Sequence, residues 1–191
     1  SLAYDIWPGS FAALIGFEVE SVPAGEDGLV HTAAVREKLG PHVAAIMLTN
    51  PNTCGLFERE ISEIADAVHQ AGGYFYCDGA NFNAIVGVAR PGDLGVDAMH
   101  INLHKTFSTP HGGGGPGSGP VVLSERLAAF APVPFLRQKD GALTLVEDTE
   151  GSQAFGRMTA FHGQMGMYVR ALSYMLSHGG DGLRQASQDA V

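Results

Sequence analysis

Polar side chains capable of chemistry follow three short apolar runs, directly after each run ends. Asn50 follows the first run, Asp78 follows the second, and His104 and Lys105 follow the third. Continuous apolar runs are typical of strands covered on both faces, and the carboxyl ends of parallel strands meet at one edge of a sheet. We therefore expect a carboxylate, a lysine, an imidazole and an amide to lie close together at that edge.

These side chains are the set that a pyridoxal phosphate (PLP) site needs. A lysine can bind the aldehyde of this cofactor covalently, and a carboxylate opposite the pyridine nitrogen favours the protonated ring, which accepts electrons. The phenolic oxygen needs a neutral donor, and the phosphate needs several donors near a loop or a helix terminus. Asp78 alone is more often a turn or cap residue, and a lone Lys105 is more often exposed. Their pairing after successive strands favours a PLP site.

The segments that must position these residues alternate between strands and helices. Hydrophobic periodicity and turn formers predict strands at residues 19–22, 43–48, 74–77, 98–101 and 121–123, and helices at residues 32–39, 58–71 and 162–177. This alternation predicts an α/β fold with an open sheet that is largely parallel in its central part. The glycine-rich stretch 112–119 would bring backbone close to the cofactor or would simply link two strands.

The composition limits the classes of partner. Hydrophobic residues make up 45% of the 191 residues, so a substantial core can form. Charged residues make up only 16%, against about a quarter in a typical soluble domain, so we expect part of the surface to be covered by further chain or by a partner. The net charge of −9 argues against nucleic-acid binding. No apolar run approaches the roughly 20 residues that cross a membrane.

The cysteines and histidines carry weaker signals. Cys54 and Cys77 form no CxxC pair, so we expect two buried thiols in a reducing compartment. His100, His104 and His111 lie near the candidate lysine, but no HExxH motif or cysteine pair accompanies them. We therefore predict no metal site.

Four blocks of sequence carry a resemblance to a known family. They are residues 49–58 (TNPNTCGLFE), 78–81 (DGAN), 90–93 (RPGD) and 102–120 (NLHKTFSTPHGGGGPGSGP). In this order they resemble the P-protein family of the glycine cleavage system, glycine dehydrogenase (decarboxylating), with gaps from about Pro8 to the end. The resemblance implies the large domain of a fold-type-I PLP enzyme, a three-layer α/β/α sandwich.

The resemblance also implies a role for each candidate residue. Lys105 would carry the cofactor, Asp78 would face the pyridine nitrogen, and Ala80 would pack on the ring. By analogy with the wider fold-type-I family, His104 would contact the phosphate and Asn50 would contact the phenolic oxygen.

The activity implied by the resemblance is PLP-dependent oxidative decarboxylation of glycine, with transfer of the aminomethyl group to the lipoyl arm of the H-protein. The implied protein is a homo- or hetero-oligomer, located in the bacterial cytoplasm or, in a eukaryote, in the mitochondrial matrix. Residues 1–191 would form a partial PLP-binding large domain, without the upstream phosphate-binding segment and the small C-terminal domain. Residues 4–10 also depart from the family pattern. We expect these 191 residues alone to be inactive.

Two alternatives remain open. Another fold-type-I PLP enzyme, such as a relative of the cysteine desulfurases or aminotransferases, would share Asp78, His104 and Lys105 but not the long glycine-rich block. The chain could instead be a non-catalytic fragment that only folds or associates. A visible absorption band after addition of PLP would separate these hypotheses.

Overall fold

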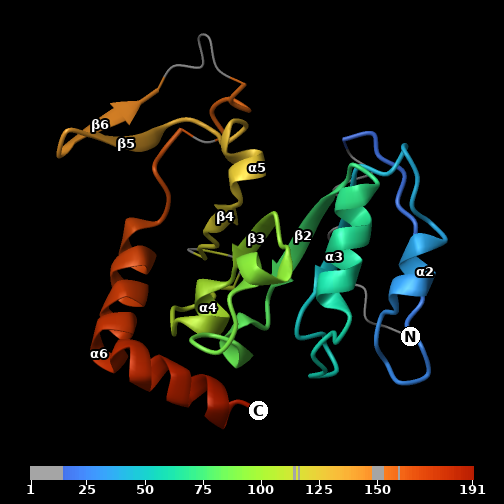
Figure 1. Cartoon of the computed structure of the whole chain (residues 1–191). Helices are drawn as coiled ribbons and strands as arrows, with labels where there is room; N and C mark the ends of the chain where they lie inside the picture. The colour runs from blue at the N-terminus through green and yellow to red at the C-terminus, as the bar shows by residue number, and fades with distance from the viewer. Residues whose placement is uncertain (1–14, 114, 116, 148–152, 159) are drawn as a thin grey trace.

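The computed structural model describes residues 15–113, 115, 117–147, 153–158 and 160–191, and its centre is a sheet of four strands (Figure 1). The strands are β1 (Ala45–Thr49), β2 (Tyr74–Gly79), β3 (Ala98–Ile101) and β4 (Val121–Leu123). Their order in the sheet follows the chain, with β1, β2 and β3 parallel and β4 antiparallel to β3. The prediction of a sheet that is parallel in its central part is therefore confirmed.

Helices separate these strands and continue beyond them. They are α2 (Thr32–Arg36), α3 (Ile61–Gln70), α4 (Leu103–Thr106), α5 (Glu125–Ala128) and α6 (Met165–Asp189), with 3-10 turns η1 (Phe82–Ala84) and η2 (Pro91–Leu94). Strands β5 (Phe135–Lys139) and β6 (Ala142–Val146) form a separate antiparallel hairpin. Within the described residues, none of the helices combines the length and the apolar character needed to cross a membrane.

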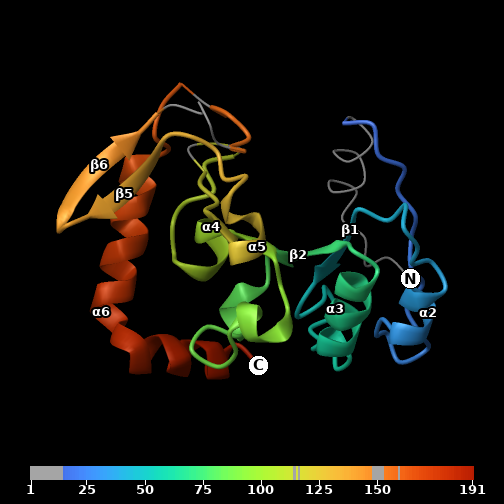
Figure 2. The same ribbon diagram turned by 45° about the horizontal axis from the view of Figure 1, so that its top comes forward.

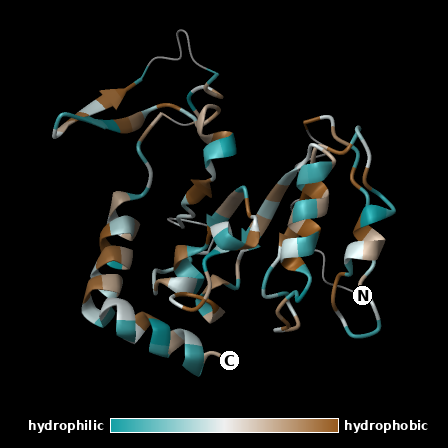
Figure 3. Ribbon diagram, in the orientation of Figure 1, coloured by the Kyte–Doolittle hydropathy of each residue, from teal (hydrophilic) through white to brown (hydrophobic). Residues whose placement is uncertain are grey.

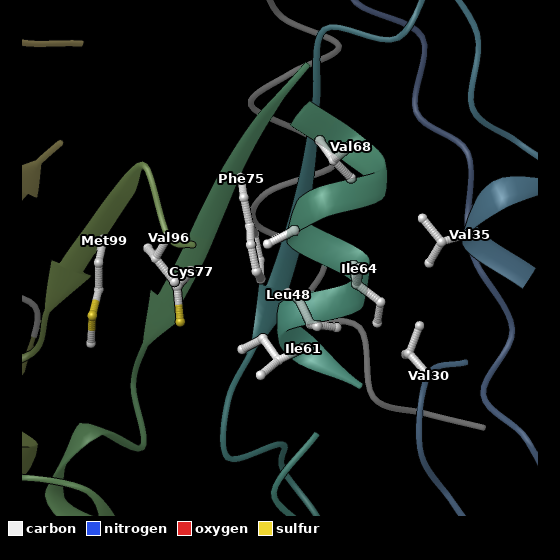
Figure 4. Close-up of a cluster of buried hydrophobic side chains, with 11 residues drawn as sticks. Val30, Val35, Leu48, Ile61, Ile64, Val68, Phe75, Cys77, Val96 and Met99 are labelled. Carbon is white, nitrogen blue, oxygen red and sulfur yellow. The ribbon is translucent and has the colours of Figure 1, made fainter. Parts of the chain in front are cut away.

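The main core lies between α3 and the strands, as Figure 4 shows. Ile61, Ile64 and Val68 recur at the spacing that places side chains on one helix face, and all three are buried. On β2, Phe75 and Cys77 alternate toward this core, and both are buried. Because successive strand residues point to opposite faces, Tyr76 and Asp78 project from the other face of the sheet.

A second cluster lies on the opposite side of the molecule, where α6 packs along α4 and η1 (Figure 2). Leu103, Phe107 and Ala171 form its buried part. The last turns of α6 are anchored to the loop after η1, because the Ser187 hydroxyl donates to the Val86 carbonyl at 2.8 Å. This cluster fixes the segment that follows β3.

Asp97 forms a polar centre at the amino end of β3. Its carboxylate accepts hydrogen bonds from His69 Nε2 at 2.7 Å and from the Phe75 amide at 2.9 Å. The Ser124 hydroxyl at 3.1 Å and Arg126 Nη1 at 2.9 and 3.0 Å complete the set of donors. Asp97 thus ties α3, β2 and the start of α5 to the sheet.

The predicted elements agree with the structure where a strand has neighbours. The predictions for 98–101 and 121–123 are confirmed, and the predicted strands at 43–48 and 74–77 lie within two residues of β1 and β2. The predicted strand at 19–22 is wrong, since these residues pair with no strand of the described chain. An apolar alternation forms a strand only where a second backbone can pair with it.

The helix ends differ more from the predictions. The segment 32–39 is helical only to Arg36, and the helix expected from residue 58 begins at Ile61. The helix expected over 162–177 begins at Met165 and continues to Asp189 through a kink at Gly179, where φ is 64° and ψ is −177°. Glycine adopts that backbone conformation readily, so Gly179 bends the helix without ending it. The short helices α4 and α5 and the β5–β6 hairpin have no counterpart among the predicted elements.

Hydrophobic residues also occur on elements outside the two clusters (Figure 3), and several of their side chains are exposed. Val121 and Val122 on β4 are 56% and 49% exposed, and Leu136 and Leu143 on the hairpin are 65% and 66% exposed. This surface agrees with the expectation, drawn from the low charge, that part of the chain is normally covered.

Candidate functional site

The carboxyl ends of β1, β2 and β3 lie side by side, and the register aligns their last residues. Thr49 pairs with Asp78, and Asp78 pairs with His100. Asn50 follows β1 directly. Lys105 lies on α4, which begins at Leu103 after the single linking residue Asn102. The structure therefore brings the predicted residues to one edge of the sheet.

Asp78 is nearly buried and is held by two donors. The Ala80 amide donates to Asp78 Oδ1 at 2.8 Å, and His100 Nε2 lies 3.2 Å from the same oxygen. Burial is the largest single influence and opposes ionisation, but the bonds from His100 and Ala80 and the charges of His100 and Lys105 outweigh it. The pKa of Asp78 is consequently below its usual value, so this carboxylate is ionised at neutral pH.

His100 lies between Asp78 and Tyr76 on the same face of the sheet. Its Nδ1 lies 2.7 Å from the Tyr76 hydroxyl, and the two rings stack with centroids 5.9 Å apart. The hydrogen bond to Asp78 raises the pKa of His100, against the effects of burial and of the Lys105 charge. Burial, with the nearby Asp78 charge, raises the pKa of Tyr76 to about 12.

Lys105 lies on the exposed side of α4, close enough to influence both groups electrostatically. Its positive charge lowers the pKa of Asp78 and opposes protonation of His100. A crevice of about 120 Å³ adjoins this lysine, between α4, η1 and α6. Its lining includes Thr106, Tyr174 and Ser187. The amine and the carboxylate required by the PLP hypothesis therefore lie within electrostatic reach of each other.

Asn50 follows β1, and Ala80 follows β2 two residues after Asp78. Asn50 is 1% exposed, and its side-chain oxygen accepts from the Glu58 amide at 3.0 Å. Its side-chain nitrogen is buried with no hydrogen-bond partner among the described residues. Ala80 is buried beside Asp78. Their predicted contacts with the phenolic oxygen and with the ring stay predictions.

His104 lies beside the glycine-rich segment. Its ring meets the His111 ring edge-on, with centroids 4.7 Å apart, beside an open hollow of about 410 Å³. Burial, followed by the charges of His111 and Lys105, lowers the pKa of His104. The ring is therefore neutral at neutral pH, and its buried Nδ1 has no partner in the described part of the chain. Its predicted contact with a phosphate stays a prediction.

Two residues of this site, His100 and Tyr76, were missed as functional candidates. From the sequence, His100 was a candidate only for a metal ligand. The available signal was strand alternation, because Tyr76 and Asp78 are two residues apart on one strand. The register that places His100 opposite Asp78 required the structure.

The prediction of two buried thiols is correct for only one of them. Cys77 is buried in the core, and burial raises the pKa of its thiol to about 11. Cys54 is exposed, because it lies in the loop after β1 whose fold is set by the side chain of Asn52. Both cysteines are free.

The residues present fit a bound PLP. Both donors to Asp78 contact Oδ1, so Oδ2 receives no hydrogen bond from the described residues and can face a pyridinium. Buried polar atoms without a described partner gather near Lys105, on Thr106, Thr109 and His104. Such atoms are costly to bury unless a ligand or water satisfies them. A site short of hydrogen-bond partners around a lysine and a carboxylate matches a polar cofactor.

Comparison with known proteins places the chain in a family. Residues 8–115, which include Asp78 and Lys105, match the class-V aminotransferase family. The chain belongs to the class-V aminotransferase family. Enzymes of this family depend on PLP, so the cofactor predicted from the side chains agrees with the membership.

This class-V aminotransferase chain has curated relatives of high identity. It is 69% identical over 183 residues to a probable glycine dehydrogenase (decarboxylating) subunit 2 of Caulobacter vibrioides, covering 94% of the chain and 35% of the relative. It is 54% identical over 180 residues to a protein of the same description in Desulforamulus reducens, covering 94% and 37%. The chain thus spans about a third of the length of these relatives.

Solved structures confirm the fold of this class-V aminotransferase chain. A sphingosine-1-phosphate lyase of Burkholderia pseudomallei superposes with a TM-score of 0.64 at 17% identity, covering 94% of this chain and 40% of that one. A cysteine desulfurase of Escherichia coli gives a TM-score of 0.60 at 17% identity, covering 91% and 42%. The predicted α/β fold of PLP fold type I is confirmed.

Proposed function

We propose that the protein containing this chain is the PLP-binding subunit of a glycine-decarboxylating enzyme. The observation that carries the proposal is the pairing of Asp78 and Lys105 at one sheet edge, in a chain 69% identical to a probable glycine dehydrogenase subunit. The cofactor, when bound, supplies an electron sink for the pair left on the α-carbon as CO2 departs.

The residues of this chain would prepare that reaction in distinct ways. Lys105 would hold the cofactor covalently until glycine displaces it. Asp78 would keep a proton on the pyridine nitrogen, since an ionised carboxylate favours the charged form of a neighbouring base. The Ala80 amide fixes the orientation of Asp78, and the orphan nitrogen of Asn50 would donate to a ligand oxygen.

The alternative PLP chemistries have weaker support. The sphingosine-1-phosphate lyase and the cysteine desulfurase share the fold at 17% identity, which carries no information on substrate. The relatives at 54–69% identity share one description. A non-catalytic role is less consistent with an ionised Asp78 next to Lys105.

We also propose a protein partner, a second subunit and a cellular location. The lipoylated H-protein would accept the aminomethyl group, because the electrons released by glycine need a disulfide as oxidant. The relatives are named as subunit 2 of their enzyme, which supports a hetero-oligomer with a second kind of subunit. The proposed location is the bacterial cytoplasm or, in a eukaryote, the mitochondrial matrix, where the H-protein would be present.

The first experiment identifies the lysine in the complete subunit. PLP is added, the bond is reduced with borohydride, and the labelled peptide is mapped. We expect label on Lys105 and none on Lys38 or Lys139, the other two lysines of the chain. Lys38→Arg serves as the matched control, because Lys38 pairs with Glu20 on the far side of the core. Label on either other lysine would contradict the assignment.

The second experiment tests the reaction. The complete subunit, its partner subunit and lipoylated H-protein are assayed for exchange of labelled bicarbonate into the carboxyl group of glycine. We expect exchange in the wild type and none in Lys105→Ala. A PLP-loaded complex that leaves glycine unlabelled but releases sulfur from cysteine would replace the proposal with the desulfurase alternative.

A further inference from the structure

Three side chains on one face of the sheet form a continuous row of close polar contacts. Tyr76 Oη lies 2.7 Å from His100 Nδ1, and His100 Nε2 lies 3.2 Å from Asp78 Oδ1. Strand alternation places Tyr76 and Asp78 on the same face of β2, and the register places His100 opposite Asp78 on β3. The row is therefore built into the pairing of two central strands.

The row has a definite direction when the imidazole is neutral. Such a ring carries one N–H donor and one acceptor nitrogen. Tyr76 keeps its proton, since burial raises its pKa to about 12, so its hydroxyl can donate to His100 Nδ1. The single N–H then lies on Nε2 and donates to Asp78. Tyr76 thus selects the tautomer that supports the carboxylate.

We propose that His100 and Tyr76 are positioning residues for Asp78, which hold its carboxylate ionised and aim its free oxygen at the pyridine nitrogen of bound PLP. The inference rests on the proposed cofactor site but not on the identity of the substrate. His100 occupies Oδ1, so only Oδ2 remains for the ring nitrogen. Without His100, burial of Asp78 would be opposed mainly by the Ala80 amide and Lys105.

The other groups around the row do not replace His100. Cys77 on β2 is a neutral thiol, because burial raises its pKa to about 11. Lys105 on α4 favours the ionised form of Asp78 but contributes through its charge rather than through a hydrogen bond. Asn102, between β3 and α4, acts on His100 and raises its pKa. Among the described residues, His100 is therefore the only side chain in direct polar contact with the Asp78 carboxylate.

The experiment compares His100→Leu, His100→Gln and Tyr76→Phe in the complete, PLP-loaded subunit. The absorption spectrum of the bound cofactor and its affinity are measured as a function of pH. In His100→Leu the pKa of Asp78 rises, so the acid-side spectral transition should move up by about one pH unit, and PLP affinity should fall about 10-fold.

The other variants keep the test independent of folding. Gln retains a neutral donor, so His100→Gln should stay within about 3-fold of wild-type affinity. Tyr76→Phe removes the hydroxyl that donates to His100 Nδ1, so neither tautomer of the imidazole is favoured. Its acid-side spectral transition should lie between those of His100→Gln and His100→Leu. Tyr74→Phe is the matched control on the same strand, since the Tyr74 ring packs beneath Arg126, and it should leave the transition unchanged.

A measurement without cofactor separates this inference from the proposed function. Nitrogen NMR of the histidine rings in the cofactor-free subunit should show a lower pKa for His100 in Asp78→Asn than in the wild type. A failure to bind PLP would refute the proposed function and leave this readout intact. An unchanged His100 titration, or the same acid transition in His100→Leu and wild type, would overturn the inference, even if turnover fell.

Discussion

The sheet carries a buried aspartate at each end, and the two are satisfied differently. Asp97, at the amino end of β3, accepts hydrogen bonds on both oxygens from His69, Phe75, Ser124 and Arg126. Asp78, at the carboxyl end of β2, accepts on one oxygen only. The pKa of each carboxyl is held below its usual value, although burial opposes this in both cases.

The difference separates an acid whose hydrogen bonds all lie within the fold from an acid that can still bind a ligand. All of the hydrogen-bonding capacity of Asp97 is used within the fold, so it has nothing to offer a ligand. Ala80 and His100 contact Oδ1 of Asp78 and keep the carboxylate charged. Its Oδ2 can accept a hydrogen bond from a ligand, within electrostatic reach of Lys105. Burial and a histidine partner are common to both, so neither feature alone identifies a site. The discriminating feature is an unused acceptor on a charged group.

The largest expected effect comes from removing the charge of Asp78. Asp78→Asn in the complete subunit should lower decarboxylation by about 1,000-fold, because an amide cannot hold the pyridinium proton. Its oxygen can still accept from Ala80 and His100, so the free energy of unfolding should change by less than about 1 kcal/mol. Bicarbonate exchange and urea unfolding measure the two quantities. Turnover near the wild-type rate would make Asp78 a structural acid like Asp97.

The next largest effect is the opposite of that in Asp78→Asn, because removing the charge of Asp97 should lower stability and leave cofactor binding intact. Asp97→Asn should lower the free energy of unfolding by about 3 kcal/mol, because the new NH2 group must face donors on whichever side it lies. The folded variant should bind PLP normally. Urea unfolding and a PLP titration check both expectations. Asp93→Asn is the matched control, since Asp93 pairs with Arg90 on the exposed surface and should cost under about 1 kcal/mol.

A glycine adjacent to Asp78 tests whether the strand pairing itself matters. A Cβ on Gly79 would clash with the His100 carbonyl oxygen, which belongs to the backbone and cannot rotate away. Gly79→Ala should therefore destabilise the subunit by about 2 kcal/mol and weaken PLP binding by displacing His100. Gly72→Ala, where a Cβ meets nothing within 4 Å but φ is 86°, controls for backbone strain alone. Equal PLP affinity in the two variants would contradict the expected displacement of His100.

The smallest effect appears on acidification. The folded pKa of Asp97 is lower than its unfolded value of about 3.9. Its ionisation therefore stabilises the fold fully above that value, and the benefit is lost as pH falls through the folded pKa. The gap in unfolding free energy between wild type and Asp97→Asn should narrow below about pH 5, by about 1.4 kcal/mol for each pH unit separating the two pKa values. A gap that stays constant down to pH 3 would indicate that packing, not charge, makes Asp97 important.

Sequence reasoning succeeded where chemistry follows directly from chain order. Asp78 lies at the carboxyl end of β2 and Lys105 follows β3, and the parallel pairing of these adjacent strands brings both residues to one edge of the sheet. His100 could not be assigned, because its role depends on the register of β2 against β3. Asp97 could not be recognised as structural, since its donors come from residues up to 29 positions away. The 19–22 strand failed for a related reason, because periodicity does not reveal whether a partner strand exists.

The donors to Asp97 also set an order of events during synthesis. Arg126 is made last of the group, well after the carboxylate that it neutralises, and β4 and α5 arrive together with it. Until then, Asp97 would be desolvated by the sheet without its cationic partner, which is unfavourable. The nascent β1–β3 sheet is therefore expected to stay loosely packed on the ribosome. It should reach its final packing only when residues near 126 have left the exit tunnel.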